Sequence, residues 1–190
     1  SAELRRSLLT GLVRILAEDR RQGAGYVAGF TVGRVFGRED DRYHEVQALA
    51  LLLCGAWPPA TIGAESRACD FADLKGVLEL IFAELHLDAV RWERVGAEAG
   101  YLHPEKAARI EVGGVLCGYA GALHPNLIAS RHRDGEPWVA ELDLMRVVQY
   151  CPRRVIFRQL PRFPAVTRDI AVLVDDEFPA QRVVDRIEDV

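Results

Sequence analysis

The clearest hydrophobic pattern in the chain is helical and runs through residues 74–85. Apolar side chains recur there at i, i+3, i+4, i+7, i+8 and i+11, which predicts a helix with one broad apolar stripe. Asp70 and Asp73 stand at the start of this pattern, where a carboxylate can accept hydrogen bonds from free helix amides. A glycine inside a helix costs about 1 kcal/mol relative to alanine, so we expect Gly76 to be required by close packing. The stripe consists of Leu74, Val77, Leu78, Ile81, Phe82 and Leu85.

A second helical pattern lies near the beginning of the chain. Leucine and isoleucine recur at helical spacing between Leu8 and Leu16. Ser7 is a suitable N-cap and Gly23 is a typical stop, so we expect a helix over residues 7–22. Gly23 and Gly25 precede a strand pattern instead of following one, and we interpret them as a helix stop and turn, not as a nucleotide-binding loop.

The remaining patterns are those of strands joined by turns. Residues 26–36 and 45–54 predict an antiparallel hairpin, with the turn-rich run 37–41 as a long connection. Gly113 and Gly114 predict a tight turn between two further strands. Many strands with few helices favour an α+β fold with a mostly antiparallel sheet flanked by helices, not a doubly wound fold. The other expected strands lie near residues 89–95, 108–112, 115–121 and 137–143.

The composition changes after Asp143. Residues 144–168 contain six arginines and no acidic residue, whereas residues 169–190 contain seven acidic residues and two arginines. Prolines stiffen the basic part into an extended linker. We therefore divide the chain into a module over residues 1–150, a linker over 151–164, and a last segment over 165–190 with a strand at 169–174 and a helix after Pro179.

Arginines of the basic region are the best candidates for a binding site. Guanidinium groups without neighbouring acids can contact RNA phosphates or an acidic partner surface. An ordinary solvated linker that happens to be rich in arginine explains the pattern equally well. The candidate residues are Arg153, Arg154, Arg158, Arg162 and Arg168.

Charge and cysteine usage exclude several classes of protein. The net charge of −4 argues against a surface dedicated to gripping nucleic acid. No apolar run reaches the roughly 18 residues that span a bilayer, and the first residues do not resemble a secretory leader. The four cysteines form no Cys-x-x-Cys pair, so we expect free thiols in a reducing cytoplasm. His103 and His124 are each followed by proline and are expected in loops, without the spacing of a metal site.

Several short motifs, taken in order, resemble the beta subunit of bacterial phenylalanyl-tRNA synthetase. Thr31 stands where that family usually has glutamate. The segment 103–108 departs from the family's His-Pro-Gly-Arg-Ser-Ala by losing the glycine and the serine. The matching segments are Leu4–Leu12, Phe30–Phe36, Asp70–Gly76, Gly118–Pro125, Glu141–Leu144 and Phe163–Ala171.

This resemblance implies a class II synthetase-like module that has lost its active site. Catalytic relatives hold ATP with an arginine in Phe-Arg-x-Glu/Asp and another in Gly-x-Gly-x-x-Arg, and neither pattern occurs in this chain. Arg34 lies on a strand of the right kind but lacks the flanking residues, so we interpret it as an ordinary strand or interface arginine. The resemblance thus implies no catalytic, cofactor or metal residue here.

The resemblance also implies partners and a place in a larger assembly. The family forms a heterotetramer of two alpha and two beta subunits, in which the alpha subunit uses ATP and magnesium to charge tRNA with phenylalanine. A non-catalytic, structural and assembly role in the cytoplasm is then expected for this chain. Residues 165–190 would begin a truncated ferredoxin-fold anticodon-binding domain. Two alternatives remain open: an RNA-binding module that acts through the arginine-rich linker, and an active ligase with degenerate motifs.

Overall fold

A computed structural model of the chain describes residues 4–39, 42–57, 66–96, 98–128, 135–152, 169, 171–175, 178 and 180–188. The chain divides into two compact units, Ser1–Cys151 and Pro152–Val190. The first unit contains a seven-stranded sheet and three α-helices, and the second contains one helix, α4, among the described residues.

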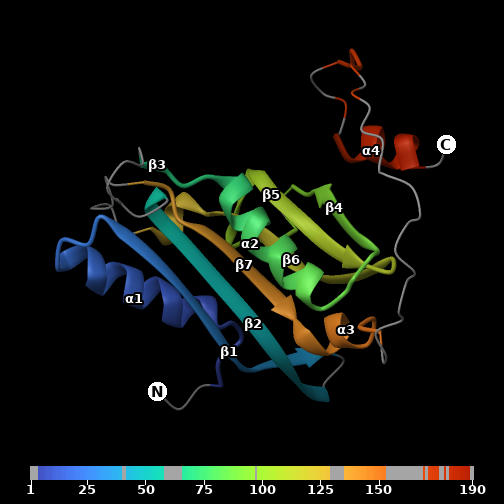
Figure 1. Cartoon of the computed structure of the whole chain (residues 1–190). Helices are drawn as coiled ribbons and strands as arrows, with labels where there is room; N and C mark the ends of the chain where they lie inside the picture. The colour runs from blue at the N-terminus through green and yellow to red at the C-terminus, as the bar shows by residue number, and fades with distance from the viewer. Residues whose placement is uncertain are drawn as a thin grey trace. The chain divides into compact units, whose positions relative to one another are not determined.

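The first unit is built on one antiparallel sheet (Figure 1). Its strands lie in the order β1-β2-β7-β6-β5-β4, and the two-residue strand β3 pairs with β2. Every strand pair is antiparallel, so the predicted α+β class with an antiparallel sheet is confirmed. The strands are β1 Tyr26–Glu39, β2 Arg42–Trp57, β3 Arg67–Ala68, β4 Val90–Arg94, β5 Leu102–Val112, β6 Val115–Leu123 and β7 Trp138–Asp143.

The hairpin of β1 and β2 is longer than the sequence pattern predicted. Strand pairing continues to Glu39 opposite Arg42, so the expected long turn over residues 37–41 is wrong. Cross-strand packing explains the extension, because the His44 ring lies over Gly37, where an added Cβ would meet its Nε2 at 2.2 Å. The tight turn at Gly113 and Gly114 is confirmed, and both glycines have positive φ angles, 58° and 79°.

The two long helices lie on opposite faces of the sheet. The helix α1 (Leu9–Arg21) packs in one hydrophobic cluster and α2 (Phe71–Glu84) in another. Alternate residues of β2 contribute to the two clusters, because side chains of a strand point alternately to its two faces. Ala48, Ala50, Leu52 and Cys54 belong to the α1 cluster, whereas Leu49, Leu51 and Leu53 belong to the α2 cluster.

The helix α2 matches the prediction in nearly every respect. Leu74, Leu78 and Phe82 are buried, and Asp70 and Asp73 form a capping box in which each side chain accepts from the other's backbone N–H. The expectation for Gly76 is wrong, because this residue is exposed and an added Cβ would meet no atom within 4 Å. Packing within the chain therefore does not explain this glycine.

The helix α1 is held at its N-terminus by a residue that the local pattern did not reveal. The expected N-cap is wrong by one position, because the cap residue is Leu8 and not Ser7. Ser7 Oγ still accepts a hydrogen bond from the Leu9 N–H at 3.1 Å. Glu141 of β7 also takes part, since its Oε1 accepts from the Leu8 N–H at 2.7 Å. The stop at Gly23 is confirmed: its φ is 85° and its N–H donates to the Arg20 carbonyl.

The second unit only partly follows the sequence pattern. The helix expected after Pro179 is present as α4, Ala180–Glu188. The strand expected at 169–174 is wrong for its described residues, because residues 171–174 are in no strand. A strand needs a neighbour for its backbone groups, and none of the described strands pairs with this segment. Three short elements were not predicted: β3, Arg67–Ala68, η1, Pro125–Leu127, and α3, Leu144–Val148.

We predict that Leu78→Ala lowers the free energy of unfolding by about 2–5 kcal/mol, because the leucine side chain is fully buried and its loss leaves a cavity. Leu80→Ala is the matched control, since Leu80 lies on the same helix but is 63% exposed. Its effect should stay within about 0.5 kcal/mol. Urea denaturation of the chain measures both values, and equal losses would contradict the packing described here.

We predict that Gly76→Ala raises the free energy of unfolding by about 0.5–1 kcal/mol, because alanine favours the helix and meets no neighbour. The same urea experiment measures the gain. Gly118→Ala provides the contrast, since a Cβ there would lie 2.2 Å from the Glu141 carbonyl oxygen. A lower free energy of unfolding in Gly76→Ala would contradict the observation that a Cβ at this position meets no neighbouring atom.

Candidate functional site

The histidines that the sequence singled out serve local turns. His103 Nδ1 accepts from the Glu105 N–H and His124 Nδ1 accepts from the Asn126 N–H, each at 3.2 Å. His124 precedes η1, but His103 lies within β5, so the expected loop position is wrong for His103. Across the described ranges, no three His, Cys, Asp or Glu side chains gather closely enough to hold a metal ion.

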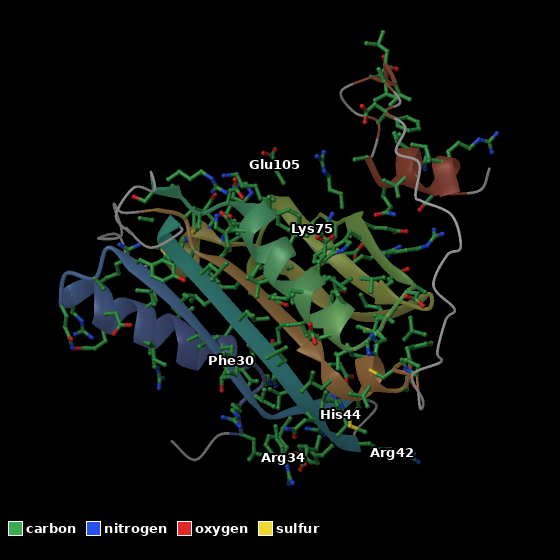
Figure 2. The ribbon with its side chains drawn as sticks, in the orientation of Figure 1. Phe30, Arg34, Arg42, His44, Lys75 and Glu105 are labelled. Carbon is green, nitrogen blue, oxygen red and sulfur yellow. The ribbon has the colours of Figure 1, made fainter. Side chains whose placement is uncertain are left out.

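Arg34 lies on the exposed part of β1, near the end of the β1–β2 hairpin (Figure 2). Its guanidinium pairs with Glu45 at 3.0 Å, and its carbonyl accepts a hydrogen bond from Arg5 Nε at 2.6 Å. Its charge is thus already compensated by a carboxylate on the neighbouring strand. This environment fits an ordinary strand arginine.

The motif at the start of α2 builds structure. The Phe71 ring lies 6.0 Å from the rings of both Trp92 and Trp138. Asp73 accepts two hydrogen bonds from the Arg67 guanidinium, at 2.7 and 2.8 Å. Hydrogen bonding from Arg67 is the main cause that lowers the pKa of the Asp73 carboxyl. The motif therefore ties α2 to β3, β4 and β7.

Lys75 of the same motif lies over an aromatic ring (Figure 2). Its Nζ is 5.5 Å from the centre of the Trp92 ring and 3.4 Å from Glu79 Oε1. Its ammonium group is therefore occupied by contacts within the chain.

A small cavity of about 230 Å³ lies on the α1 face of the sheet, beside Tyr101, Tyr119 and Glu141. Burial raises the pKa of the Tyr101 hydroxyl, and the negative charge of Glu141 raises it further. The Tyr101 phenol is therefore neutral at physiological pH. The Glu141 carboxylate is held by the Leu8 N–H.

The arginine that lines this cavity is already engaged. Arg146 donates to the Leu116 carbonyl at 2.9 Å and pairs with Asp143 at 3.2 Å. The polar groups around the cavity are thus the carboxylates of Glu141 and Asp143, two phenol side chains and a compensated guanidinium. This set offers no free positive charge to a triphosphate.

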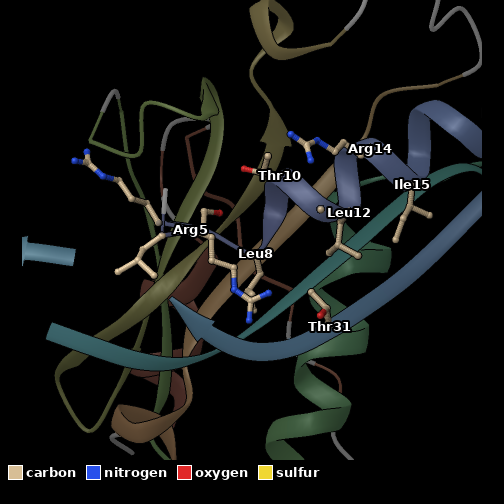
Figure 3. Close-up of a pocket in the computed structure, with 11 residues that line it drawn as sticks. Arg5, Leu8, Thr10, Leu12, Arg14, Ile15 and Thr31 are labelled. Carbon is tan, nitrogen blue, oxygen red and sulfur yellow. The ribbon is translucent and has the colours of Figure 1, made fainter. Parts of the chain in front are cut away.

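A larger groove of about 570 Å³ lies between α1 and the outer strand β1 (Figure 3). Thr31 of β1 faces α1 across it, and Leu12 and Ile15 project from the helix above. Three arginines, Arg5, Arg6 and Arg14, contribute to its lining. Two exposed apolar residues, Leu4 and Ile15, line it, whereas the exposed Phe30 and Val32 of β1 lie on the sheet face where α2 packs.

None of the described residues that line this groove was a sequence-based candidate. Arg153, Arg154, Arg158 and Arg162 lie outside the described residues, as does Arg168. The groove itself was missed. The pattern over residues 26–36 predicted a strand of a hairpin, but nothing local showed that this strand is an edge of the sheet.

Three of the four cysteines are buried, and Cys151 is half-buried. None of the four forms a disulfide bond, as expected, and Cys54 and Cys117 lie in strands. Burial raises the pKa of the Cys69 thiol to about 11 and also raises that of Cys117. These two thiols stay protonated near neutral pH and are poor nucleophiles.

Comparison with known proteins places the chain in a family. Residues 1–144 match the family model described as the phenylalanyl tRNA synthetase beta chain CLM domain. The chain belongs to the phenylalanyl-tRNA synthetase beta chain family. The match covers the sheet and its two long helices, so the family resemblance of the sequence motifs is confirmed. None of the described helices combines the length and apolarity needed to cross a membrane.

Individual relatives agree with this assignment. The chain is 36% identical over 181 residues to the phenylalanine–tRNA ligase beta subunit of Moorella thermoacetica, and 33% over 184 residues to that of Lactiplantibacillus plantarum. It is 28% identical over 182 residues to that of Thermotoga maritima. These alignments cover 95–96% of the chain but only 22–23% of the relatives. The chain thus spans less than a quarter of the length of these family members.

We predict that Asp73→Asn lowers the free energy of unfolding at neutral pH. The variant should also lose less of this free energy than the wild type when the pH is lowered. The folded pKa of Asp73 is lowered, so the ionised carboxylate stabilises the fold above its unfolded pKa of about 3.9. This contribution disappears as the pH falls through the folded pKa. Urea denaturation from pH 7 down to pH 3 measures it, with Asp88→Asn as control. If the free energies of unfolding of wild type and variant differ as much at pH 3 as at pH 7, the pairing of Asp73 with Arg67 does not stabilise the fold.

Proposed function

We propose that the chain is the non-catalytic structural and subunit-assembly module of a phenylalanine–tRNA ligase beta chain, with a class II synthetase-like fold. Its proposed partner is the catalytic alpha subunit, in a cytoplasmic heterotetramer of two alpha and two beta subunits. ATP, magnesium and the chemistry of phenylalanine activation are assigned to the alpha subunit, and tRNA to the intact complex.

One observation carries the non-catalytic part of this proposal: the charge of the cavity on the α1 face. Adenylate formation builds negative charge on the α-phosphate, which a ligase must stabilise with fixed positive groups. The cavity instead presents Glu141 and two tyrosines, and its arginine is paired with Asp143. A triphosphate would meet repulsion from the carboxylate without a compensating guanidinium.

The assembly part of the proposal is supported by exposed apolar surface. Phe30 and Val32 of β1 are 72% and 50% exposed on one face of the sheet, and Ile15 of α1 is exposed on the other side. Exposed apolar surface of this kind supports an interface with another protein. The family membership supplies a candidate for that protein, since its members are named as beta subunits.

The linker arginines stay a separate part of the proposal. Arg153, Arg154, Arg158, Arg162 and Arg168 are proposed to contact tRNA phosphates or an acidic face of the partner. Their number and the absence of acids between residues 144 and 168 support this role.

We predict that the chain alone neither catalyses ATP–pyrophosphate exchange with phenylalanine nor binds ATP at micromolar concentration. It should nevertheless co-purify with a co-expressed bacterial phenylalanyl-tRNA synthetase alpha subunit. Isothermal titration with Mg²⁺-ATP and affinity purification of the tagged chain test the two statements. The intact ligase serves as the positive control for exchange.

Three results would count against the proposal. Exchange activity of the isolated chain would identify a ligase with degenerate motifs. Absence of the alpha subunit from the purified chain would remove the assembly role. Salt-dependent RNA binding without alpha-subunit binding would favour an RNA-binding module that acts through the linker.

A further inference from the structure

The cavity on the α1 face of the sheet is lined by apolar as well as polar side chains. Val35 of β1 lies directly opposite Val46 of β2, and Ala48 follows two residues later on the same face. The volume of the cavity is about 230 Å³. An engineered apolar cavity of about 150 Å³ holds one benzene molecule, so the space beside these residues admits one small organic molecule.

Glu141 of β7 lines the same cavity, next to Tyr119 of β6. The two residues are cross-strand partners, so their side chains leave the sheet side by side on one face. Glu141 is half-buried, and its Oε1 accepts the Leu8 N–H at 2.7 Å. Among the described residues, no lysine, arginine or histidine forms an ion pair with Glu141. Its second oxygen, Oε2, therefore has no compensating cation in the described chain.

The two other charged groups that line the cavity compensate each other. Asp143 Oδ1 accepts from the N–H groups of Met145 and Arg146 at 2.9 and 3.1 Å. Asp143 Oδ2 pairs with the Arg146 guanidinium at 3.2 Å, and this guanidinium also donates to the Leu116 carbonyl. Among the lining residues, Glu141 is thus the charged group that lacks an opposite charge.

Two phenol rings lie close to this carboxylate. Tyr101 and Tyr119 both pack against the α1 hydrophobic cluster. Burial raises the pKa of the Tyr101 hydroxyl, and the charge of Glu141 raises it further, as expected for a hydroxyl within electrostatic reach of the carboxylate. Phenol oxygens accept hydrogen bonds, and aromatic rings attract cations to their faces. A positive group beside Glu141 would therefore find further partners in both tyrosines.

The set of acceptors favours an ammonium group over other cations. An ammonium carries three N–H donors on a compact charge, which suits one carboxylate oxygen and two phenol oxygens. A guanidinium pairs best with both oxygens of one carboxylate, but Glu141 Oε1 already accepts the Leu8 N–H. A calcium ion needs about six to eight oxygen ligands. A ligand with a carboxylate of its own would be repelled by Glu141 and Asp143.

We propose that this cavity binds the ammonium group of a small primary alkylamine that carries no acidic group. The ammonium donates to Glu141 Oε2 and to the hydroxyls of Tyr101 and Tyr119. The alkyl chain lies against Val35 and Val46, where removal of its surface from water contributes to binding. The charge-assisted hydrogen bond to the carboxylate supplies the selectivity. The site goes beyond the proposed assembly role, because neither a partner subunit nor ATP takes part in it.

The probe is n-butylammonium, added to the full chain at neutral pH and followed by NMR of the backbone amides. The chemical shifts of Tyr101, Tyr119 and Glu141 should change and saturate at millimolar concentrations. Uncharged n-butanol has the same chain length and should bind about tenfold more weakly, because hydrogen bonds to charged groups are the stronger ones. Binding of n-butylguanidinium should also be weaker than that of n-butylammonium. Since no ligase subunit is present, the result is separate from that of the co-purification experiment.

Variants of the chain separate charge from shape. Glu141→Gln removes the charge but keeps an oxygen that can accept the Leu8 N–H, so it should weaken n-butylammonium binding about tenfold and leave n-butanol binding unchanged. Tyr119→Phe keeps the ring, loses the hydroxyl and should weaken n-butylammonium binding a few-fold, which provides a test even if Glu141→Gln does not fold. Glu111→Gln is the matched control, since Glu111 is a half-buried carboxylate that already pairs with Arg109. It should bind as wild type does.

Four results would overturn the proposal. Equal affinity for n-butylammonium and n-butanol would show that the cavity selects shape and not charge, and equal affinity for n-butylguanidinium would remove the preference for an ammonium. Unchanged binding of n-butylammonium to folded Glu141→Gln, or to Tyr119→Phe, would exclude the assigned partners. Shifts that never saturate, or that spare the residues lining the cavity, would exclude this site.

Discussion

The structure depends on the burial of β2 from both sides. Residues 48–54 of this strand are apolar and buried throughout, with α1 packed on one face and α2 on the other. The two faces are not equivalent, since α1 lies over Ala48 and Ala50, whereas α2 lies over Leu49 and Leu51. A slip of one residue in register would exchange these sets and place leucines where α1 lies against alanines. This asymmetry fixes the register of β2 against β1 and β7.

Glu141 links this sheet to the surface on which function is proposed. Its carboxylate accepts from the Leu8 N–H, and negative charge at a helix N-terminus is stabilised by the helix dipole. The contact anchors the start of α1 on β7 and so shapes the groove between α1 and β1. The same carboxylate gives the neighbouring cavity a charge opposite to the one that ATP requires. One residue thus supports the scaffold and disfavours nucleotide binding.

The two edges of the sheet have different surface chemistry. At the β4 edge, the exposed Glu93 forms an ion pair with Arg109 of the neighbouring strand β5. At the β1 edge, Phe30 and Val32 expose apolar surface beside a basic groove. A monomer gains nothing from leaving this surface in water, whereas an added chain would bury it.

The sequence alone determined the features that depend on near neighbours. The 3.6-residue period located α2 and its buried Leu74 and Leu78, the paired glycines located the β5–β6 turn, and ordered motifs indicated the family. Only the tertiary structure decided that Glu141 caps α1 and that Phe30 lies on an edge. It also showed that Gly76 has open space beside it. These facts follow from contacts between residues distant in the chain, which hydrophobic period and turn propensity do not encode. The strand expected at 169–174 failed for the same reason, because a strand exists only where another strand pairs with its backbone.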